Sequence, residues 1–298
     1  MRVAPPVAQA IAAGRPVVAL ESALVTHGFA PPANLEIAQR MEAAVRQESA
    51  LPATIAVLEG EPRVGLAAAE LAALASDRTA RKVSLRDFPL VLAQGASGGT
   101  TVAATMHLAH RAGIRIFATG GIGGVHRGHP EDVSADLPAL ASIPVIVVCA
   151  GAKAILDLPR TLEYLETRGV TVIGYGTDEF PAFYSRHSGL GVDARVETEE
   201  EVARMARART DLGLSSALLV CAPVPQADAL PAGEAEDAIG RAVAEAEAAG
   251  VSGKALTPFL LSRVVELTGG LARCANESLL LNNARLAARI ARALGRLQ

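Results

Sequence analysis

The sequence predicts an α/β fold with three layers, α/β/α, in which a mostly parallel central sheet is covered by helices on both faces. Short runs rich in β-branched residues alternate along the chain with longer alanine-rich segments of helical period. The runs are nearly continuous in apolar residues and show no alternation of apolar and polar positions. Such strands are typical of a sheet that is buried on both sides.

The expected strands and helices follow one another in regular order. The strands are expected over residues 15–22, 53–60, 114–121, 143–150, 170–176 and 217–224. The helices are expected near residues 34–49, 64–76, 100–112, 153–167, 198–212, 234–249, 257–268 and 276–295. No linker of low complexity and no internal repeat divides the 298 residues, so we expect a single domain over residues 1–298.

Composition and charge exclude several classes of partner. Half of the residues are hydrophobic and 20% are charged, as in a globular protein with a large core. The net charge is −3 and no long basic run occurs, so neither nucleic acid nor an anionic membrane surface is expected as a partner. No apolar run is long enough for a membrane span or a signal peptide, and we expect a cytoplasmic protein. Cys149, Cys221 and Cys274 are widely spaced and are expected to be small buried residues.

Lys153 stands out in a chain that otherwise uses arginine. Of 28 basic residues, only Lys82, Lys153 and Lys254 are lysine, which offers a nucleophilic amine or a compact charge. Lys153 follows the strand at 143–150, at the strand end where ligands bind in such folds, and is expected in the first turn of the next helix. The helix dipole and partial burial would there favour the uncharged amine that Schiff-base chemistry needs. The alternative is a structural lysine that extends into solvent.

Two further segments carry candidate site residues. Glu21 directly follows the first strand and could act as a general acid or base, or could cap a neighbouring helix. The glycine-rich segment 118–128 follows another strand, and its backbone amides could hold a phosphate. Its spacing does not fit a dinucleotide-binding loop. His126 and Arg127 at its end suit an anionic ligand or a loop salt bridge.

Asp132 and Asp136, with Ser134 between them, precede a helix. This pair could hold a hard divalent cation, or could cap the helix. Asn276 has the pattern of an ordinary helix N-cap, and Lys82 is uninformative when taken alone.

Longer strings resemble one family. They occur here in that family's order: ALES with THG, KVS with RD, GGTTVAATM, FATGGIGGVHRG, DVSADL, VCAGAKAILD, GYGTDEFPAF, TPFLL with ELTGG, and NNARLA. They closely resemble the pseudouridine-5′-phosphate glycosidases of the indigoidine synthase A-like family. The resemblance runs from about Val17 to the last helix, essentially the whole chain.

The resemblance implies reversible cleavage of the carbon–carbon glycosidic bond of pseudouridine 5′-phosphate with water, giving uracil and D-ribose 5-phosphate. It matches Lys153 to the covalent nucleophile and Glu21 to the proton donor. It implies substrate contacts for Lys82, Val102, Ser134, Ala135, Asp136, His126 and Asn276. Asp132 matches a carboxylate associated with one Mn²⁺ ion per subunit. A homotrimer with an α/β/α core is implied as well, without the sugar-kinase domain that some relatives carry.

The chemistry of a carbon leaving group explains why a lysine is needed. Uracil C5 has no lone pair to protonate, unlike the leaving atom in an ordinary glycosidase. An amine that adds at C1′ can hold the sugar as an imine while a positioned acid delivers a proton to C5. A Schiff-base lyase or aldolase acting on another phosphosugar is the main alternative. A sugar-phosphate-binding protein without catalysis and an N-nucleosidase are the others, and Lys254 has no assigned role.

Overall fold

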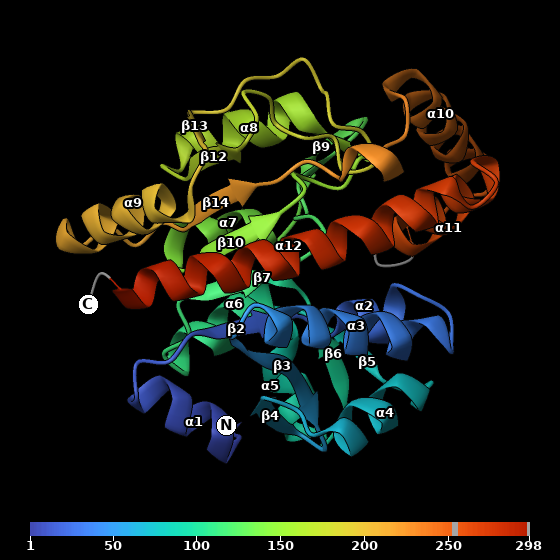
Figure 1. The fold of residues 1–298 in the computed structure, drawn as a ribbon. Helices are drawn as coiled ribbons and strands as arrows, with labels where there is room; N and C mark the ends of the chain where they lie inside the picture. Colours follow the sequence, from blue (N-terminus) through green and yellow to red (C-terminus); the bar gives the residue numbers. More distant parts are fainter. Residues whose placement is uncertain (252–255, 297–298) are drawn as a thin grey trace.

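The computed structural model describes residues 1–251 and 256–296, and a large sheet runs through its centre (Figure 1). Seven neighbouring strands of this sheet are parallel. In spatial order they are β3 (Leu51–Leu58), β2 (Val17–Leu20), β7 (Ile116–Ala118), β10 (Ile146–Cys149), β14 (Leu218–Cys221), β12 (Thr171–Tyr175) and β13 (Ala194–Val196). The first six of these are the six predicted strands, so the prediction of a mostly parallel sheet is confirmed.

Edge strands that the sequence did not predict extend the sheet beyond β3. They are β4 (Glu61–Val64) and β6 (Gly98–Thr100), both antiparallel to β3, together with β1 (Arg2–Val3) and β5 (Arg81–Val83). A separate small antiparallel sheet contains β11 (Leu156–Asp157), β8 (Val125–His126) and β9 (His129–Val133). This small sheet joins the end of the glycine-rich segment to the residues that follow Lys153, because β8 and β11 pair directly.

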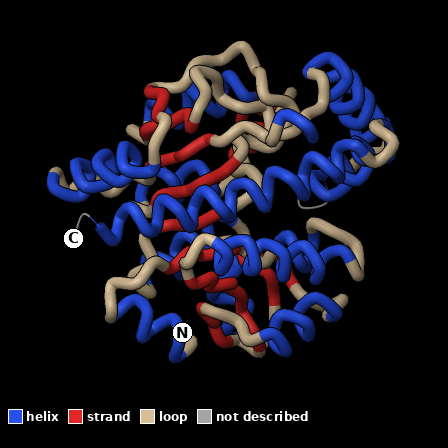
Figure 2. The backbone as a smooth tube through the Cα atoms, viewed as in Figure 1, coloured by secondary structure: helices blue, strands red, loops and turns tan. Residues whose placement is uncertain are grey.

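Helices cover both faces of the central sheet, which confirms the predicted three layers (Figures 1 and 2). The long helix α12 (Leu271–Arg296) crosses β2, β7 and β10 on one face, where α3 (Ala33–Gln47) and α9 (Glu199–Asp211) pack beside it. The opposite face carries α6 (Val102–Arg111), α7 (Asp136–Ser142) and α8 (Leu158–Thr167). Every residue of β2, β7, β10 and β14 is buried, as expected for strands covered on both sides.

The remaining helices lie around these layers. They are α1 (Pro5–Ala12), α2 (Ala23–His27), α4 (Ala68–Ser76), α5 (Phe88–Ala93), α10 (Ala232–Ala248) and α11 (Leu256–Leu267), with short 3₁₀ turns at Leu85–Asp87 and Gln226–Asp228. Helices α10 and α11 pack against each other, and α11 also contacts α12. None of the described helices has the length and apolar character needed to cross a bilayer.

Three predictions about single residues are wrong. Helix α8 begins at Leu158, so Lys153 does not lie in its first turn; the side chain of Asp157 caps the helix by accepting a hydrogen bond from the Arg160 amide, and a proline occupies its first turn. Helix α12 begins at Leu271, so Asn276 lies inside it and is no N-cap. Cys149 and Cys221 are buried, but Cys274 is exposed. Lys254 lies outside the described residues.

Candidate active site

A cavity of about 510 Å³ opens at the C-terminal ends of β2, β7 and β10. All ten residues that the sequence singled out for the site line it: Glu21, Lys82, Val102, His126, Asp132, Ser134, Ala135, Asp136, Lys153 and Asn276. They come from segments as far apart in the sequence as Glu21 and Asn276. The parallel sheet brings them together because its strand ends converge on one edge.

Glu21 follows β2 directly, and its neighbour Ser22 fixes this strand end. The buried Ser22 hydroxyl donates to the Ile55 carbonyl (2.5 Å) and accepts from the Thr100 amide (3.0 Å). The Thr100 hydroxyl also donates to the Ile55 carbonyl (2.7 Å). These buried bonds tie the Glu21 segment to β3 and to the residue before the cap of α6. The distance between Glu21 and the start of α6 is therefore set by backbone and hydroxyl contacts.

The carboxyl of Glu21 is suited to hold a proton. Burial raises the pKa of Glu21 above its ordinary value. The ammonium of Lys153 and a hydrogen bond from the Thr119 hydroxyl act in the opposite direction, and they do not cancel the effect of burial. The structure therefore favours a carboxyl group that keeps its proton to higher pH than an ordinary glutamic acid and can serve as a general acid. Thr119 was not predicted as a site residue. Its position directly after the strand β7 is the one feature of the sequence from which it could have been found.

Lys153 lies in the connection between β10 and β11. Its backbone amide donates to the Ile122 carbonyl (3.0 Å), and its carbonyl accepts from the Leu156 amide (3.0 Å). Two residues earlier, Gly151 has a φ of +85°, and a Cβ atom there would lie 2.0 Å from the Pro181 carbonyl oxygen. Only glycine fits this turn, which carries the chain from β10 into the cavity wall at Lys153.

The glycines of segment 120–124 serve close packing. A Cβ atom on Gly121 would lie 2.6 Å from the Phe183 ring, and one on Gly124 would lie 2.4 Å from the Thr161 hydroxyl. The amides of Ile122, Gly123 and Val125 donate to groups of the protein itself. These three amides are therefore not available to a phosphate, and the suggestion of a phosphate cradle is left with the other amides of the segment.

Asp136 joins two walls of the cavity. It is 6% exposed; one carboxylate oxygen accepts from the Ala103 amide (3.0 Å), and the other accepts from the Gly123 amide (2.8 Å). Its own amide donates to the Ser134 hydroxyl (3.2 Å). Both oxygens are thus used for amides of α6 and of the glycine-rich segment. These bonds favour a structural role for Asp136 over a role as a cation ligand.

His126 and Asp132 face the cavity from the small antiparallel sheet, on β8 and β9. Burial lowers the pKa of His126, while the Asp132 carboxylate opposes that effect. His126 is therefore favoured in its neutral form, which can accept or donate a hydrogen bond. Within residues 1–251 and 256–296, no three His, Cys, Asp or Glu side chains gather into a group that could hold a metal ion.

Arg127 forms a salt bridge, which is the structural alternative that the sequence offered beside an anion contact. Its guanidinium forms an ion pair with Glu236 of α10 and donates to the carbonyls of Ala154 (3.0 Å) and Leu156 (3.1 Å). It lines a second cavity of about 560 Å³ beside α10. Because Ala154 and Leu156 follow Lys153 closely, Arg127 supports the Lys153 segment from outside the active-site cavity.

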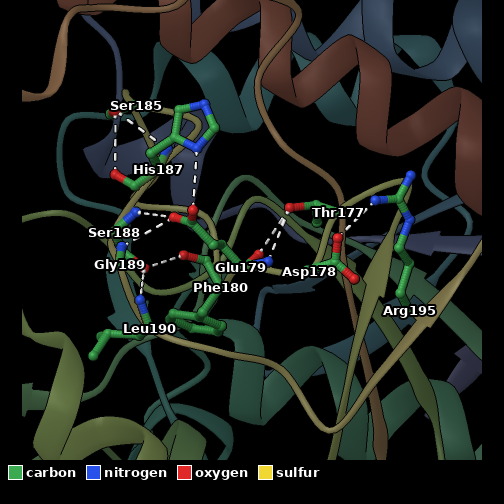
Figure 3. A network of polar contacts seen from close by, with 10 residues as sticks. All are labelled: Thr177, Asp178, Glu179, Phe180, Ser185, His187, Ser188, Gly189, Leu190 and Arg195. Atoms are coloured by element: carbon green, nitrogen blue, oxygen red, sulfur yellow. Dashed lines mark hydrogen bonds and ion pairs between the residues drawn. The ribbon is translucent and has the colours of Figure 1, made fainter.

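The loop after β12 closes one side of the cavity with Phe183. This loop is held by its own polar groups (Figure 3): the Glu179 carboxylate accepts from the Ser188 and Gly189 amides (both 3.0 Å), and the Ser188 hydroxyl donates to the Phe180 carbonyl (2.6 Å). Phe183 has a φ of +61°, which is uncommon for a residue with a side chain. The loop contacts hold it there, with its ring against Gly121 and at 76° to the ring of Tyr184.

The cavity also includes residues from predicted strings to which no role had been given. They are His27 of the string THG, and Ser84, Arg86 and Asp87 of the string KVSLRD. Asn276 and Leu280 of α12 approach Gly120, where an added Cβ atom would lie 3.6 Å from the Asn276 amide oxygen. Polar groups thus gather near Lys82, while Phe183, Leu261 and Leu280 supply apolar surface.

Comparison with known proteins identifies relatives over the whole chain. The family model of indigoidine synthase A like proteins matches residues 6–293. The pseudouridine-5′-phosphate glycosidase of Rhodospirillum centenum is 62% identical over 296 residues, which is 99% of this chain and 92% of the relative. That of Methylobacterium nodulans is 57% identical over 293 residues, which is 98% of this chain and 87% of the relative.

Two solved structures share the fold. The prealnumycin C-glycosynthase AlnA in complex with ribulose 5-phosphate is 40% identical, with a TM-score of 0.92 over 100% of this chain and 97% of that one. An indigoidine synthase A-like protein from Thermotoga maritima is 38% identical, with a TM-score of 0.89 over 95% and 94% of the two chains. The chain therefore belongs to the indigoidine synthase A-like family.

Proposed function

We propose that this protein is a pseudouridine-5′-phosphate glycosidase, which reversibly converts pseudouridine 5′-phosphate and water into uracil and D-ribose 5-phosphate in pseudouridine catabolism. The observation that carries the proposal is the presence of an amine, Lys153, and a carboxyl group with a raised pKa, Glu21, in one cavity, after the C-terminal ends of β10 and β2, which flank β7. Relatives 50–62% identical over nearly the full chain bear this name.

Lys153 supplies the nucleophile. Its amine forms a bond to C1′ of the sugar, and the ribose ring opens. When the C1′–C5 bond breaks, its electron pair leaves with uracil, and the open-chain sugar stays on Lys153 as an imine. Water then hydrolyses the imine to release ribose 5-phosphate and the free amine. A guanidinium cannot take this part, which explains a lysine in a chain of arginines.

Glu21 supplies the proton that uracil C5 needs. A carbon leaving group must be protonated as its bond to the sugar breaks, and such acid catalysis typically contributes about 100- to 10,000-fold. Burial keeps Glu21 protonated to a higher pH than an exposed carboxyl group. The Ser22 and Thr119 contacts hold the carboxyl in place, so that the proton is delivered to one position.

The phosphate binds at the start of α6. Val102 is the first residue of this ten-residue helix and lines the cavity beside Lys82 of β5. The amides of Ala103 and Ala104, the next two residues, already donate to Asp136 (3.0 Å) and Thr101 (3.5 Å), so they are not counted as phosphate contacts. The positive end of the helix dipole and the ammonium of Lys82 both favour a dianion at this place. Ser134, Ala135 and Asp136 form the facing wall.

A divalent cation fits beside this phosphate. Asp132 lines the cavity as an oxygen ligand of the kind that Mn²⁺ and Mg²⁺ prefer. One carboxylate is too few for a closed site, so waters and phosphate oxygens would complete the shell, as is common for these ions. Bound there, the ion would neutralise and orient the phosphate. The homotrimer, which the family resemblance implies, and the cytoplasmic location, which was expected from the sequence, belong to the same proposal.

A second candidate is a Schiff-base enzyme that acts on another phosphosugar. The likeness to AlnA, a C-glycosynthase solved with ribulose 5-phosphate, favours it. Both candidates use Lys153 and predict an imine, so the imine does not distinguish them. Uracil release does, because only the glycosidase forms that product.

The test is uracil release from pseudouridine 5′-phosphate by the purified full chain with Mn²⁺, compared with its Lys153→Ala variant. Release by the wild type and its loss in the variant are expected. Release by both would retain the function and overturn the covalent mechanism. No release by a folded, metal-loaded wild type would overturn the glycosidase proposal and turn attention to other phosphosugars.

A further inference from the structure

Asn283 is a polar side chain in the middle of the apolar layer that α12 presses onto the sheet. It is 0% exposed. Its side-chain amide donates to the Thr119 carbonyl (2.8 Å) and reaches the Gly120 carbonyl (3.4 Å). Its amide oxygen has no hydrogen-bond partner among the residues that the structure describes. An unpaired buried oxygen costs free energy, so packing alone does not account for an asparagine at this position.

The residue that Asn283 holds is the one that contacts the acid. Thr119 is fully buried, and its backbone amide donates to the Val148 carbonyl (3.0 Å). Its hydroxyl donates to the carboxylate of Glu21. The Thr119 carbonyl accepts a hydrogen bond from the Asn283 side-chain amide. The Gly120 carbonyl accepts a second, shorter bond from the Ala150 amide (2.8 Å) and so depends less on Asn283. The Asn283 bond therefore matters most for Thr119.

We propose that Asn283 is a positioning residue for catalysis, which fixes Thr119 and, through the Thr119 hydroxyl, the carboxyl group of Glu21. The inference rests on the proposed function, because it assigns to Glu21 the delivery of a proton. This chain of hydrogen bonds connects three places that are distant in sequence: Asn283 in α12, Thr119 directly after β7 and Glu21 directly after β2. Packing of α12 onto the sheet thereby becomes part of the acid's geometry.

The electrostatic surroundings of Glu21 predict the direction of the effect. Lys153 and Lys82 face the carboxyl group with positive charge, and Asp136 faces it with negative charge. These three remain when Asn283 is changed. The Thr119 hydrogen bond lowers the pKa of Glu21, so loosening this bond raises that pKa further. Activity that needs protonated Glu21 falls as the pH rises through its pKa, and that fall moves to higher pH.

The experiment measures kcat and KM for uracil release across pH in full-length wild type, Asn283→Ala, Thr119→Val, Thr119→Ser and the Thr119→Val/Asn283→Ala double variant. The neighbouring, partly exposed Asn282 gives the matched control, Asn282→Ala. We expect Asn283→Ala and Thr119→Val each to lower kcat by about 10- to 100-fold with little change in KM, and to move the alkaline fall of activity to higher pH. Asn282→Ala should behave like the wild type, and Thr119→Ser, which keeps the hydroxyl, should lose less activity than Thr119→Val.

The coupling between the two substitutions distinguishes a positioning role of Asn283 from a purely structural one. If Asn283 acts through Thr119, the double variant loses little more than Thr119→Val alone. Losses in kcat that multiply, or an Asn283→Ala protein with an unchanged pH profile, would overturn the proposal. If Asn283→Ala does not fold, Thr119→Val still tests the second link of the chain, the hydroxyl bond from Thr119 to Glu21, and an unmoved alkaline fall in that variant would overturn the proposal.

A readout without turnover separates this inference from the proposed function. Isotope-edited infrared titration follows the Glu21 carboxyl band, which Glu21→Gln identifies by its loss. The band should titrate at higher pH in Asn283→Ala than in wild type, even if the wild type releases no uracil. Equal titration of the two proteins would contradict the positioning role, whatever the substrate is.

Discussion

The carboxylate of Asp136 accepts a hydrogen bond from the amide of Gly123 at 2.8 Å, while its other oxygen accepts from the first turn of α6. Asp136 thus links the glycine-rich segment to the helix start where the phosphate is expected. The cavity depends on this link, because neither wall has a regular sheet contact with the other at this place.

Asp136→Asn should lower kcat/KM for pseudouridine 5′-phosphate by about 10- to 100-fold. An asparagine replaces one accepting oxygen with an amino group, so one buried amide loses its acceptor at a cost of about 1–3 kcal/mol. Uracil release and thermal melting of wild type and variant check this. Full activity in the variant would show that the link does not shape the site.

Gly123→Ala should impair both folding and activity. The added Cβ atom would lie 2.1 Å from the Ser134 hydroxyl oxygen and 2.8 Å from an Asp136 carboxylate oxygen, so the cavity wall must shift. Gly191→Ala is the matched control, because a Cβ atom there meets nothing within 4 Å. Melting curves and uracil release should separate the two variants; equal behaviour would contradict the close packing described for Gly123.

Glu21→Gln should remove activity and make the protein relatively more stable as the pH rises. The folded-state pKa of Glu21 is raised, so its contribution to stability is present below the unfolded value of about 4.3 and is lost as the pH rises through the folded pKa. Glutamine does not ionise. The melting temperature of Glu21→Gln minus that of wild type should therefore increase between pH 4 and pH 9. A difference that is constant or falls would contradict the raised pKa.

Lys82→Ala should weaken the preference for a phosphorylated substrate. Loss of a charged contact to phosphate costs about 1.5–3 kcal/mol, or about 10- to 100-fold in kcat/KM. The ratio of kcat/KM for pseudouridine 5′-phosphate to that for pseudouridine should fall accordingly. Arg81→Ala is the control, because its guanidinium bonds Gln94 (2.8 Å) outside the cavity. An equal fall in both variants would show a general effect of charge and no phosphate contact by Lys82.

The central strands could be predicted because burial on both faces leaves a signal in their own residues. Strands such as β10 and β14 are buried at every residue, and parallel strands in such a sheet read as continuous apolar runs. The edge strands could not be predicted in this way. β4 reads EPRV and β6 reads GGT, and neither has an apolar run or an alternating pattern. Their pairing with β3 depends on partners elsewhere in the chain.

Site residues could be predicted where a local sequence pattern marks them. They could not be predicted where their role depends on a hydrogen bond to a residue far away in the sequence. Glu21 and Lys153 could be found from strand ends and residue type. Thr119 matters because it bonds a residue 98 positions away, and Asn283 because it bonds one 164 positions away. The helix start after Lys153 was misplaced because the alanine-rich pattern extends upstream of the Asp157 cap. Local pattern does not reveal such contacts.

The central claim is that the Lys153 amine forms an imine with the sugar. Cyanoborohydride reduction during incubation with ribose 5-phosphate, followed by mass spectrometry of peptides, tests it most directly, because the reverse reaction starts from this product. We predict a reduced sugar adduct on the peptide that contains Lys153 and none on the peptide that contains Lys82, which lines the same cavity. An adduct on Lys82, or no adduct in a protein that releases uracil, would contradict the account.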